Sequence, residues 1–397
     1  AAATPDVLFS VVMPTYQRAS TLRHVLDVWA QQQPADLPFE IVAVDDGSRD
    51  ATPAVLRAAR PTRYRLRVVR QPNGGPARAR NRALGLARGR YVLFTGDDIE
   101  PTPDLLARHA ETHRAHGDPD LAVLGLTRWA TPDRSAAGRA PTRTMRHIDG
   151  AGSQQFSYRF FDDGASYDFR HFYTSNVSVD RDLLLRAPDG FSTDYPAAAF
   201  EDAEFAFRLT QHGMRIVYRA DAVGLHHHPY DAAGFCRRQM RCGAMAAVLY
   251  RQRPVLGRFL DLARLRRARM RLLAQPQPTV VGEVLAALET WETRAERWAA
   301  SFDPPHHPAA DDPVDDLLRA LFRLAYLRGL ASALYRPDTA RRLRARLLLD
   351  FMPAAIGSCA DRLDLLHHPY PMADAERFRD LRRRRMAQDD EDDDVAD

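Results

Sequence analysis

Seven residues decide how the fold is interpreted: Val92-Leu93-Phe94-Thr95-Gly96-Asp97-Asp98. The run of apolar and β-prone residues is short, so it predicts a buried strand with the glycine and the two acids at its carboxyl end. Ligands of an open α/β sheet bind just beyond the carboxyl ends of its strands. Adjacent carboxylates repel each other unless a cation lies beside them, and Mg²⁺ or Mn²⁺ prefers oxygen ligands. Taken alone, the stretch is more typical of a strand with an acidic, solvated turn, and the rest of the chain changes that weighing.

Strand and helix patterns alternate before this stretch. The predicted strands cover residues 8–13, 39–44, 64–69 and 91–94. One predicted helix begins near Ser20, and two others cover residues 51–60 and 77–87. Such an alternation predicts a mostly parallel sheet with helices on both faces. The second strand also ends in acids and a glycine, Asp45-Asp46-Gly47-Ser48.

A turn, Asn73-Gly74-Gly75-Pro76, precedes the helix predicted at 77–87. Free amides point outward at a helix start, so this turn could hold a phosphate. It matches neither the dinucleotide glycine fingerprint nor the Walker pattern, and neither of those folds is therefore supported.

Residues 127–170 are rich in Arg, Ser, Gly and Asp and are expected to form a long excursion. An alternating strand follows at 173–179, then a helix at 200–209, then a strand at 216–218. The helix has Glu201 and Asp202 in its first turn, and the histidines His226, His227 and His228 come after the last strand. Beyond about residue 232 the β pattern stops. We therefore expect an α/β domain over 1–232, a helical region over 233–385 and an acidic, disordered tail over 386–397.

Composition excludes several classes of protein. The chain has 397 residues, 45% of them hydrophobic, which is enough for a large core. All 56 basic residues are arginine, so Schiff-base chemistry and a Walker lysine are excluded. Three irregularly spaced cysteines indicate neither a disulfide framework nor a zinc site, which fits a cytoplasmic protein. The net charge of +4 does not favour nucleic acid, and no apolar run reaches the roughly 20 residues of a membrane helix.

Taken together, these motifs resemble the family 2 glycosyltransferases of the GT-A fold over a little more than half of the chain. The matching residues, in chain order, are Pro14-Thr15-Tyr16 with Arg18, Asp45-Asp46-Gly47-Ser48, Asn73-Gly74-Gly75 with Ala79-Arg80-Asn81, Gly96-Asp97-Asp98, Asn176, Glu201-Asp202 and His226. Each motif is weak alone, and their common order and spacing make the signal strong.

The resemblance implies a role for each of these positions. The nucleotide would be bound by Pro14, Thr15, Tyr16, Arg18, Asp46, Gly74, Arg80 and Asp97. A divalent ion, Mn²⁺ or Mg²⁺, would be held by Asp98, Asp97 and His226, with Asp98 as the main ligand. The catalytic acids would be Asp202, as general base, and Glu201. One departure is Thr95, which stands where the family usually has a further Asp, so both Asp97 and Asp98 are named for the metal.

The chemistry of a sugar transfer needs the same residue types. A metal stabilises the charge on a leaving diphosphate, and a separate carboxylate removes the proton of the attacking hydroxyl. From the residues alone, purely structural roles for these acids and histidines stay open. Glu201 and Asp202 also suit the helix dipole, and a His-rich loop is often only polar surface. We favour His226 as a ligand because imidazole suits Mn²⁺, and leave His227 and His228 open.

The expected function is an inverting, metal-dependent glycosyltransferase that uses a nucleotide sugar, with a UDP sugar as the expected donor. The acceptor would be a hydroxyl of a glycan, a lipid-linked molecule or a small molecule. A catalytically silent sugar-nucleotide or glycan-binding protein is the main alternative. A nucleotidyltransferase ranks lower, because its glycine-rich loop with a lysine is missing.

The C-terminal region contains one unusually basic segment. Residues 251–271 include eight arginines and a single acid, Asp261. An apolar stripe at helical spacing is formed by Leu256, Phe259, Leu260, Ala263 and Leu265. A helix docked on the catalytic domain is the favoured interpretation. The alternative is peripheral contact with the inner face of a membrane or with an anionic, lipid-linked acceptor.

Overall fold

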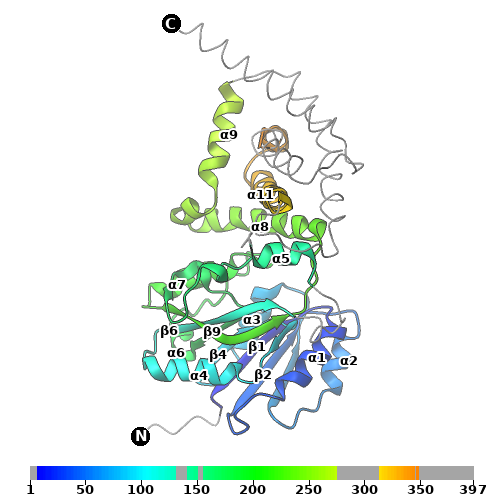
Figure 1. Cartoon of the computed structure of the whole chain (residues 1–397), viewed down its shortest axis with the longest axis vertical. Helices are drawn as coiled ribbons and strands as arrows, with labels where there is room; N and C mark the ends of the chain where they lie inside the picture. Colours follow the sequence, from blue (N-terminus) through cyan, green and yellow to red (C-terminus); the bar gives the residue numbers. More distant parts are fainter. Residues whose placement is uncertain (1–6, 131–140, 151–154, 275–312, 345, 348–397) are drawn as a thin grey trace. The chain divides into compact units, whose positions relative to one another are not determined.

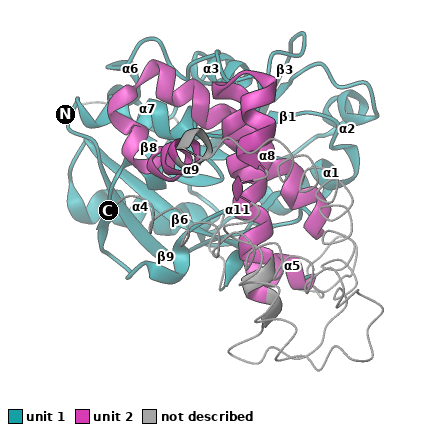
Figure 2. Cartoon of the chain, turned by 90° about the horizontal axis from the view of Figure 1, so that it is seen from above, with its two compact units in different colours: residues 1–141, 148–229 teal, residues 142–147, 230–397 magenta. Residues whose placement is uncertain are grey.

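The computed structural model describes residues 7–130, 141–150, 155–274, 313–344 and 346–347 (Figure 1). The chain divides into two compact units, coloured separately in Figure 2. The first comprises residues 1–141 and 148–229, and the second comprises residues 142–147 and 230–397.

The first unit is built on a nine-stranded mixed sheet with the order β3-β2-β1-β4-β8-β6-β9-β5, and β7 pairs with β9 beside this path. The strands are β1 (Phe9–Thr15), β2 (Phe39–Asp45), β3 (Arg65–Arg70), β4 (Tyr91–Thr95), β5 (Ile99–Pro101), β6 (Leu121–Trp129), β7 (Ser166–Tyr167), β8 (Asn176–Asp180) and β9 (Arg215–His226). The strands β3, β2, β1 and β4 run parallel, as the βα alternation predicts. The prediction of a mostly parallel α/β sheet is confirmed for this half.

The other half of the sheet is mixed. Strand β8 is antiparallel to both β4 and β6, β9 runs parallel to β6, and β5 returns antiparallel to β9. The strand expected at 216–218 continues to His226, so this histidine ends β9 and does not follow it in a loop. In the pairing of β5 with β9, Ile99 stands opposite His226. The segment after the acid pair therefore lies beside the histidines.

Helices cover both faces of the sheet (Figure 1). They are α1 (Ala19–Trp29), α2 (Thr52–Ala58), α3 (Pro76–Leu84), α4 (Leu105–His116), α6 (Arg181–Leu185) and α7 (Glu201–Thr210). Successive side chains of a strand point to opposite faces. In β1, Val11 and Met13 join the core cluster with α1, α2 and α4, whereas Val12 joins the one with α3, α6 and α7. Both faces of the parallel half are thus packed mainly with apolar side chains.

A buried polar network fixes the mixed half of the sheet. The Nδ2 group of Asn176 donates to the carbonyl oxygens of Leu126 and Ala222, and its Oδ1 atom lies 2.9 Å from Nε2 of His109. Ser178 Oγ lies 2.8 Å from Nδ1 of His109 and 2.8 Å from Nε2 of His113. Burial lowers the pKa of His109 to about 4 and that of His113 to about 3, so both rings are neutral. Each ring can then donate through Nε2, and Asn176, one of the resemblance motifs, has a structural role here.

The segment predicted as one long excursion, residues 127–170, contains regular elements. They are the end of β6, α5 (Arg143–Asp149), the short 3₁₀ helix η1 (Tyr158–Phe160) and β7, and a second 3₁₀ helix, η2 (Phe169–His171), comes at its end. Residues 131–140 and 151–154 lie outside the described residues. The long, partly mobile excursion predicted here thus contains regular elements in its described part, and an aromatic cluster that includes Phe156, Tyr158 and Phe161 supplies a core there.

The second unit is helical, as expected for the region after residue 232. Its described elements are α8 (Ala232–Gln252), the 3₁₀ helix η3 (Pro254–Phe259), α9 (Leu262–Ala274) and α11 (Pro313–Leu334). Helices α8 and α11 pack closely through glycines, because a Cβ atom on Gly243 would lie 1.9 Å from the carbonyl oxygen of Tyr326. None of the described helices is long and apolar enough to cross a membrane. The tail expected at 386–397 lies outside the described residues.

Residues 251–271 do not form the single amphipathic helix that their spacing allows. The chain ends α8 at Gln252, passes through η3 and begins α9 at Leu262. Pro254 cannot continue the hydrogen bonding of a helix, and Asp261 adopts a left-handed conformation with φ 56°. Leu256, Leu260 and Leu265 are nevertheless buried. The apolar stripe is thus used for packing, on two short elements instead of one.

Candidate active site

The acid pair Asp97 and Asp98 follows β4 at the carboxyl end of the parallel strands, where it was expected. Both residues are buried, with 7% and 9% exposure. Gly96 lets the chain turn back here, because a Cβ atom at this position would lie 2.7 Å from Oδ1 of Asp98. The carbonyl oxygen of Asp98 accepts a hydrogen bond of 2.9 Å from the backbone N–H of His227. Backbone geometry thus fixes the direction of the Asp98 carboxylate.

The two carboxyl groups ionise differently. Burial and the charge of Asp98 raise the pKa of Asp97 to about 7. For Asp98, burial acts in the same direction but is outweighed by His226, Arg18 and His228, and its pKa is lowered. Asp98 is therefore the permanent negative charge of the pair, which suits it to bind a cation.

Arg18 lies directly against this pair. Its Nη2 atom is 3.2 Å from Oδ2 of Asp98, and its Nε atom is 3.7 Å from Oδ1 of Asp97. The start of α1 is held by side chains that follow β2, because Ser48, Thr52 and Asp50 accept hydrogen bonds from the backbone amides of residues 17, 18 and 19, respectively. Residue 17 adopts φ 53°, a strained conformation for glutamine. The side chains of Ser48, Asp50 and Thr52 thus hold the backbone that carries Arg18, and its guanidinium lies against the two acids.

Histidines complete the surroundings of Asp98. The Nε2 atom of His226 lies 3.6 Å from Oδ2 of Asp98, and Nδ1 of His228 lies 3.9 Å from the same oxygen. The ring of Trp129 stacks on His226 with 4.8 Å between the ring centroids. Strand pairing brings these residues together, since Trp129 stands opposite His226 in β6 and β9.

Asp46 holds the turn at residues 73–75. Its carboxylate accepts hydrogen bonds from the backbone amides of Gly74 and Gly75, at 2.9 Å and 2.8 Å, and from the side chain of Gln71 at 2.8 Å. The amides of these glycines are therefore engaged, and the expectation that they are free to bind a phosphate is wrong. The negative charge at the end of β2 explains the difference, because a carboxylate competes for the same donors as a phosphate.

The second acid pair opens α7. Glu201 is buried and accepts a hydrogen bond of 2.7 Å from Nη1 of Arg80, whose guanidinium also lies over the ring of Phe191. Asp202 is partly buried, and its Oδ1 atom accepts a hydrogen bond of 2.8 Å from the backbone N–H of Ala203. Phe200, at the N-cap, adopts a left-handed conformation with φ 66°, which is strained for an aromatic residue. The chain thus turns sharply just before the two acids.

Burial and the negative charge of Glu201 raise the pKa of Asp202 to about 7, and the positive charge of Arg80 opposes this shift. A carboxylate with a pKa near neutral pH can accept a proton from a hydroxyl group during a reaction and release it afterwards. Asp202 therefore has the ionisation that a general base needs, as has Asp97.

Comparison with known proteins supplies the family. Residues 10–162 match the model described as glycosyl transferase family 2. The chain carries a family 2 glycosyltransferase domain. The matched segment begins in β1 and contains Asp46, Arg80 and the acid pair of β4. The observed α/β sheet with a helical C-terminal region agrees with the GT-A fold expected from the resemblance.

Curated relatives are similar to this glycosyltransferase domain. A validoxylamine A glucosyltransferase of Streptomyces hygroscopicus subsp. jinggangensis (strain 5008) is 30% identical over 234 residues, which are 55% of this chain and 55% of that protein. The succinoglycan biosynthesis protein ExoO of Rhizobium meliloti (strain 1021) is 38% identical over 113 residues, which are 28% of this chain and 31% of that protein. The chain thus spans about half or less of the length of these relatives.

Two solved structures have a weaker similarity. The TarS fragment 1–349 of S. aureus in complex with UDP has a TM-score of 0.46 at 19% identity, over 88% of this chain and 92% of that one. The mannosyltransferase PcManGT of Pyrobaculum calidifontis, in complex with GDP-Man and Mn²⁺, has a TM-score of 0.45 at 22% identity, over 93% and 83%. Similarity at this level carries no argument about ligands.

The glycosyltransferase domain gathers most of the expected site residues into two sets. Arg18, Asp97, Asp98 and His226 form one set, joined by the ion pairs above. Arg80, Glu201 and Asp202 form the other. Of the expected nucleotide turn, Thr15 is buried beside Asp97, Pro14 is partly buried and Tyr16 is 43% exposed. Arg80 faces Glu201, whereas the resemblance places it near a diphosphate.

Several residues that shape the domain were not expected from the sequence. Ser48, Asp50 and Thr52 hold the start of α1, and a search for helix-capping residues in the loop after β2 could have found them. No sequence pattern marks Trp129, because its stacking on His226 depends on the pairing of β6 with β9.

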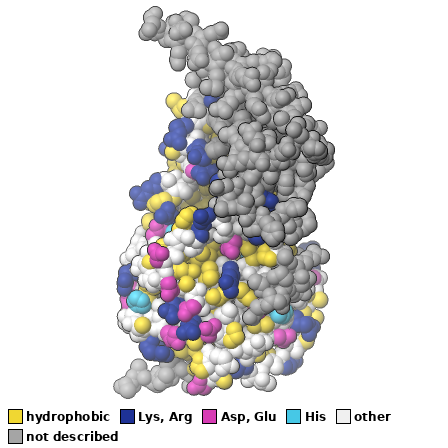
Figure 3. All heavy atoms as spheres, in the orientation of Figure 1, with side chains coloured by type: hydrophobic (Ala, Val, Ile, Leu, Met, Phe, Trp, Pro, Cys, Tyr) yellow, Lys and Arg dark blue, Asp and Glu magenta, His cyan; other side chains and the backbone are white. Residues whose placement is uncertain are grey.

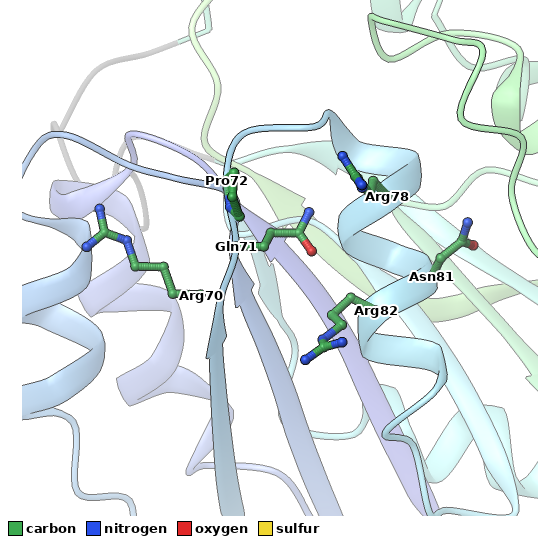
Figure 4. A pocket seen from close by; sticks show the side chains of 6 residues that line it. All are labelled: Arg70, Gln71, Pro72, Arg78, Asn81 and Arg82. Atoms are coloured by element: carbon green, nitrogen blue, oxygen red, sulfur yellow. The ribbon is translucent and has the colours of Figure 1, made fainter.

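A basic pocket of about 490 Å³ was also missed. It is lined by Arg70, Gln71, Pro72, Arg78, Asn81 and Arg82 (Figure 4). Strand β3 and the residues after it supply one side, and α3 supplies the other. Its three arginines make it a place where an anion would be attracted, next to the turn that Asp46 holds.

Proposed function

We propose that this protein is an inverting, metal-dependent glycosyltransferase. It moves a sugar from a nucleoside-diphosphate sugar, with a UDP sugar as the expected donor, to the hydroxyl group of an acceptor. The observation that carries the proposal is the division of labour at the start of α7. Arg80 neutralises Glu201 through an ion pair, while burial and the charge of Glu201 raise the pKa of Asp202 to about 7.

Asp202 acts as the general base. The acceptor hydroxyl donates its proton to the carboxylate of Asp202 as its oxygen attacks the anomeric carbon from the face opposite the diphosphate. The bond between that carbon and the diphosphate breaks, and the configuration is inverted in one displacement. Glu201 does not take the proton, because Arg80 holds its carboxylate in a buried ion pair. It acts as a positioning residue instead.

Tyr16 and the acid pair receive the donor. The exposed ring of Tyr16 offers a flat apolar surface to the base of a nucleotide, and aromatic rings stack well on bases. Asp97, with its raised pKa, can donate as well as accept a hydrogen bond to a ribose hydroxyl. Asp46 supports this binding indirectly, by holding the turn at Gly74 and Gly75 in place.

The residues around Asp98 fit a divalent ion. An ionised carboxylate with imidazole nitrogens at 3.6 Å and 3.9 Å is a donor set that suits Mn²⁺ and, less well, Mg²⁺. Asp98 and His226 would be the main ligands, and Asp97 would assist. The ion, when bound, supplies positive charge that stabilises the leaving diphosphate. Arg18 contributes a further positive charge at the same place.

The acceptor class follows from the reaction alone. A glycan, a lipid-linked molecule or a small molecule with a free hydroxyl satisfies it, and nucleic acid is not expected as a partner. We place the reaction in the cytoplasm, with contact to the inner face of a membrane as an additional proposal. A named relative glucosylates validoxylamine A, and a small polar acceptor of that kind is included in the proposal.

One experiment tests the proposed function. UDP, GDP, dTDP and CDP sugars are screened with Mn²⁺ by thermal shift, and a bound donor should raise the melting temperature. The best donor is then incubated with candidate acceptors, and NMR determines the anomeric configuration of the product. Inversion supports the proposal, and retention contradicts the mechanism. A donor that binds but never releases nucleoside diphosphate would identify a binding protein instead. Full activity in excess EDTA would exclude the metal.

A further inference from the structure

Three side chains outside the active-site sets converge on one point. The Nε2 atoms of His24 and His227 each lie 2.8 Å from Oε2 of Glu100. Among the residues that the structure describes, this is the only place where ligand atoms of three His, Cys, Asp or Glu side chains lie within 4.8 Å of one another. The Asp97, Asp98 and His226 group does not meet that criterion.

The fold brings these residues together from three elements. His24 comes from α1, Glu100 from β5, and His227 directly follows β9. The antiparallel pairing of β5 with β9 sets Glu100 beside the end of β9, and the rings of His24 and His227 meet edge to face at 5.3 Å. The pairing of β5 with β9 thus positions Glu100 and His227, and α1 supplies His24.

Two of the three side chains are deeply buried. The side chains of Glu100 and His227 are each 3% exposed, and that of His24 is 38% exposed. A buried carboxylate is costly unless it is paired with a positive charge or bound to a metal. A divalent ion at this point would supply both positive charge and coordination to the three side chains.

The distances fit a zinc ion. Zinc bonds to nitrogen and oxygen are about 2.0–2.2 Å, so neighbouring ligand atoms of a tetrahedral site lie about 3.3 Å apart. A widening of each 2.8 Å contact by about half an ångström would admit the ion. The exposed side of His24 leaves room for a water as the fourth ligand. Two histidines and one glutamate form a known ligand set for Zn²⁺.

We propose that His24, Glu100 and His227 form a second divalent-cation site, selective for Zn²⁺ and separate from the one at Asp98. Its ligands tie α1 to the corner between β5 and β9. His227 also donates its backbone N–H to the carbonyl oxygen of Asp98, so the ion stabilises the segment that carries Asp98 and His226. The site is structural, and it does not depend on the proposed glycosyl transfer.

One feature of His227 limits the affinity of the proposed site for Zn²⁺. The Nδ1 atom of His227 is buried and has no hydrogen-bond partner among the described residues. A histidine that binds a metal usually donates its other ring N–H to an acceptor, and loss of that contact weakens a site by about 10–100-fold. We therefore expect moderate affinity, with Zn²⁺ removable by prolonged dialysis against a chelator.

The test uses the full chain, freed of metal by EDTA, with no nucleotide present. Calorimetric titration with Zn²⁺ is done on Asp98→Asn protein, in which the first site is disabled. The variants Asp98→Asn/His24→Gln and Asp98→Asn/His212→Gln are compared with it. His212 is an exposed histidine elsewhere in the same unit and serves as the control.

We expect Asp98→Asn and the His212 control to bind one Zn²⁺ equally well, and the His24 variant to bind it at least about tenfold more weakly. Zn²⁺ should also raise the melting temperature of the first two proteins only. Equal binding by the His24 variant, or no binding by Asp98→Asn, overturns the proposal. If Asp98→Asn does not fold, His24→Gln is compared with wild type, and the stoichiometry should fall by one ion.

Discussion

At the scale of single residues, neighbouring acids have different roles because their partners differ. Asp97 and Asp98 are adjacent, yet His226 and His228 stabilise the charge on Asp98, and Arg18 lies closer to Asp98 than to Asp97. Glu201 and Asp202 are also adjacent, and Arg80 bonds only to Glu201. In each pair one carboxylate makes the closer contact with an arginine, and the pKa of the other is raised to about 7. The position in sequence alone cannot reveal such a division.

The pH dependence of turnover follows from Asp202. A general base is active when it is ionised, so turnover should rise with pH through about 7 and level off above. Glu201→Gln removes the negative charge that raises the pKa of Asp202, so the midpoint should move to lower pH. Arg80→Gln removes an opposing positive charge, so the midpoint should move to higher pH. Profiles of kcat against pH at saturating donor check this, and a midpoint unmoved by both variants would exclude Asp202 as the titrating group.

The ion pair between Arg80 and Glu201 should also stabilise the fold. Arg80→Gln leaves the buried Glu201 carboxylate without its partner, and loss of one member of a buried pair costs about 3–5 kcal/mol. Urea denaturation should show this loss in the free energy of unfolding. The double variant Arg80→Gln/Glu201→Gln should regain much of it, because no buried charge remains. A single variant as stable as the wild type would mean that the pair is solvated.

At the scale of elements, local pattern predicts the parallel half of the sheet well. Residues 8–13, 39–44 and 91–94 are buried apolar runs bounded by turn residues, and each lies in a strand. The position of Asp97 and Asp98 at a strand end could be read from the same runs. The end of β9 could not, because His226 is held by pairing with distant β5 and β6. The break of residues 251–271 into η3 and α9 was missed, although Pro254 signals it.

The contact between α8 and α11 allows a test at this scale. In an open helix, Gly→Ala stabilises by about 1 kcal/mol. A Cβ atom on Gly243 would lie 1.9 Å from the carbonyl oxygen of Tyr326, so Gly243→Ala must push the helices apart. We expect a loss of about 1–3 kcal/mol, as for an overpacked core. Thermal unfolding measures it, with Gly85→Ala as a neutral control, since its nearest neighbour would be 3.6 Å away. Stabilisation by Gly243→Ala would contradict the packing.

At the scale of the whole molecule, the two units differ in chemistry. The glycosyltransferase domain carries the two acid pairs and the histidines around Asp98, and the second unit carries the arginine-rich segment at residues 251–271. Figure 3 shows basic and hydrophobic side chains interspersed on the visible face of the second unit's described part. The leucines of residues 251–271 are largely buried, while Arg258, Arg266, Arg267 and Arg269 are exposed. The interpretation in which the leucines pack and the arginines lie in solvent is therefore favoured, and membrane contact stays a prediction.

That prediction is tested with vesicles that contain anionic lipid. If the arginines face a membrane, the protein should pellet with the vesicles at low salt, since each Arg near the surface contributes about 1 kcal/mol. Binding should fade as salt screens the charges. Replacing Arg264, Arg266, Arg267 and Arg269 with Gln should release the protein while its melting temperature is unchanged. If the wild-type protein stays in solution even at low salt, the prediction of membrane contact is wrong and residues 251–271 have a structural role only.

The most direct test of the central claim is the turnover of Asp202→Asn. The amide keeps the size of the side chain but cannot accept the proton of the acceptor hydroxyl. With the best donor and acceptor at pH 8, release of nucleoside diphosphate should fall by about 10²–10⁴-fold, with the KM for the donor nearly unchanged. Asp189→Asn, which alters an exposed acid of the same unit, should behave as wild type. If Asp202→Asn keeps wild-type turnover, or loses donor affinity alone, Asp202 is not the base and the proposed mechanism is wrong.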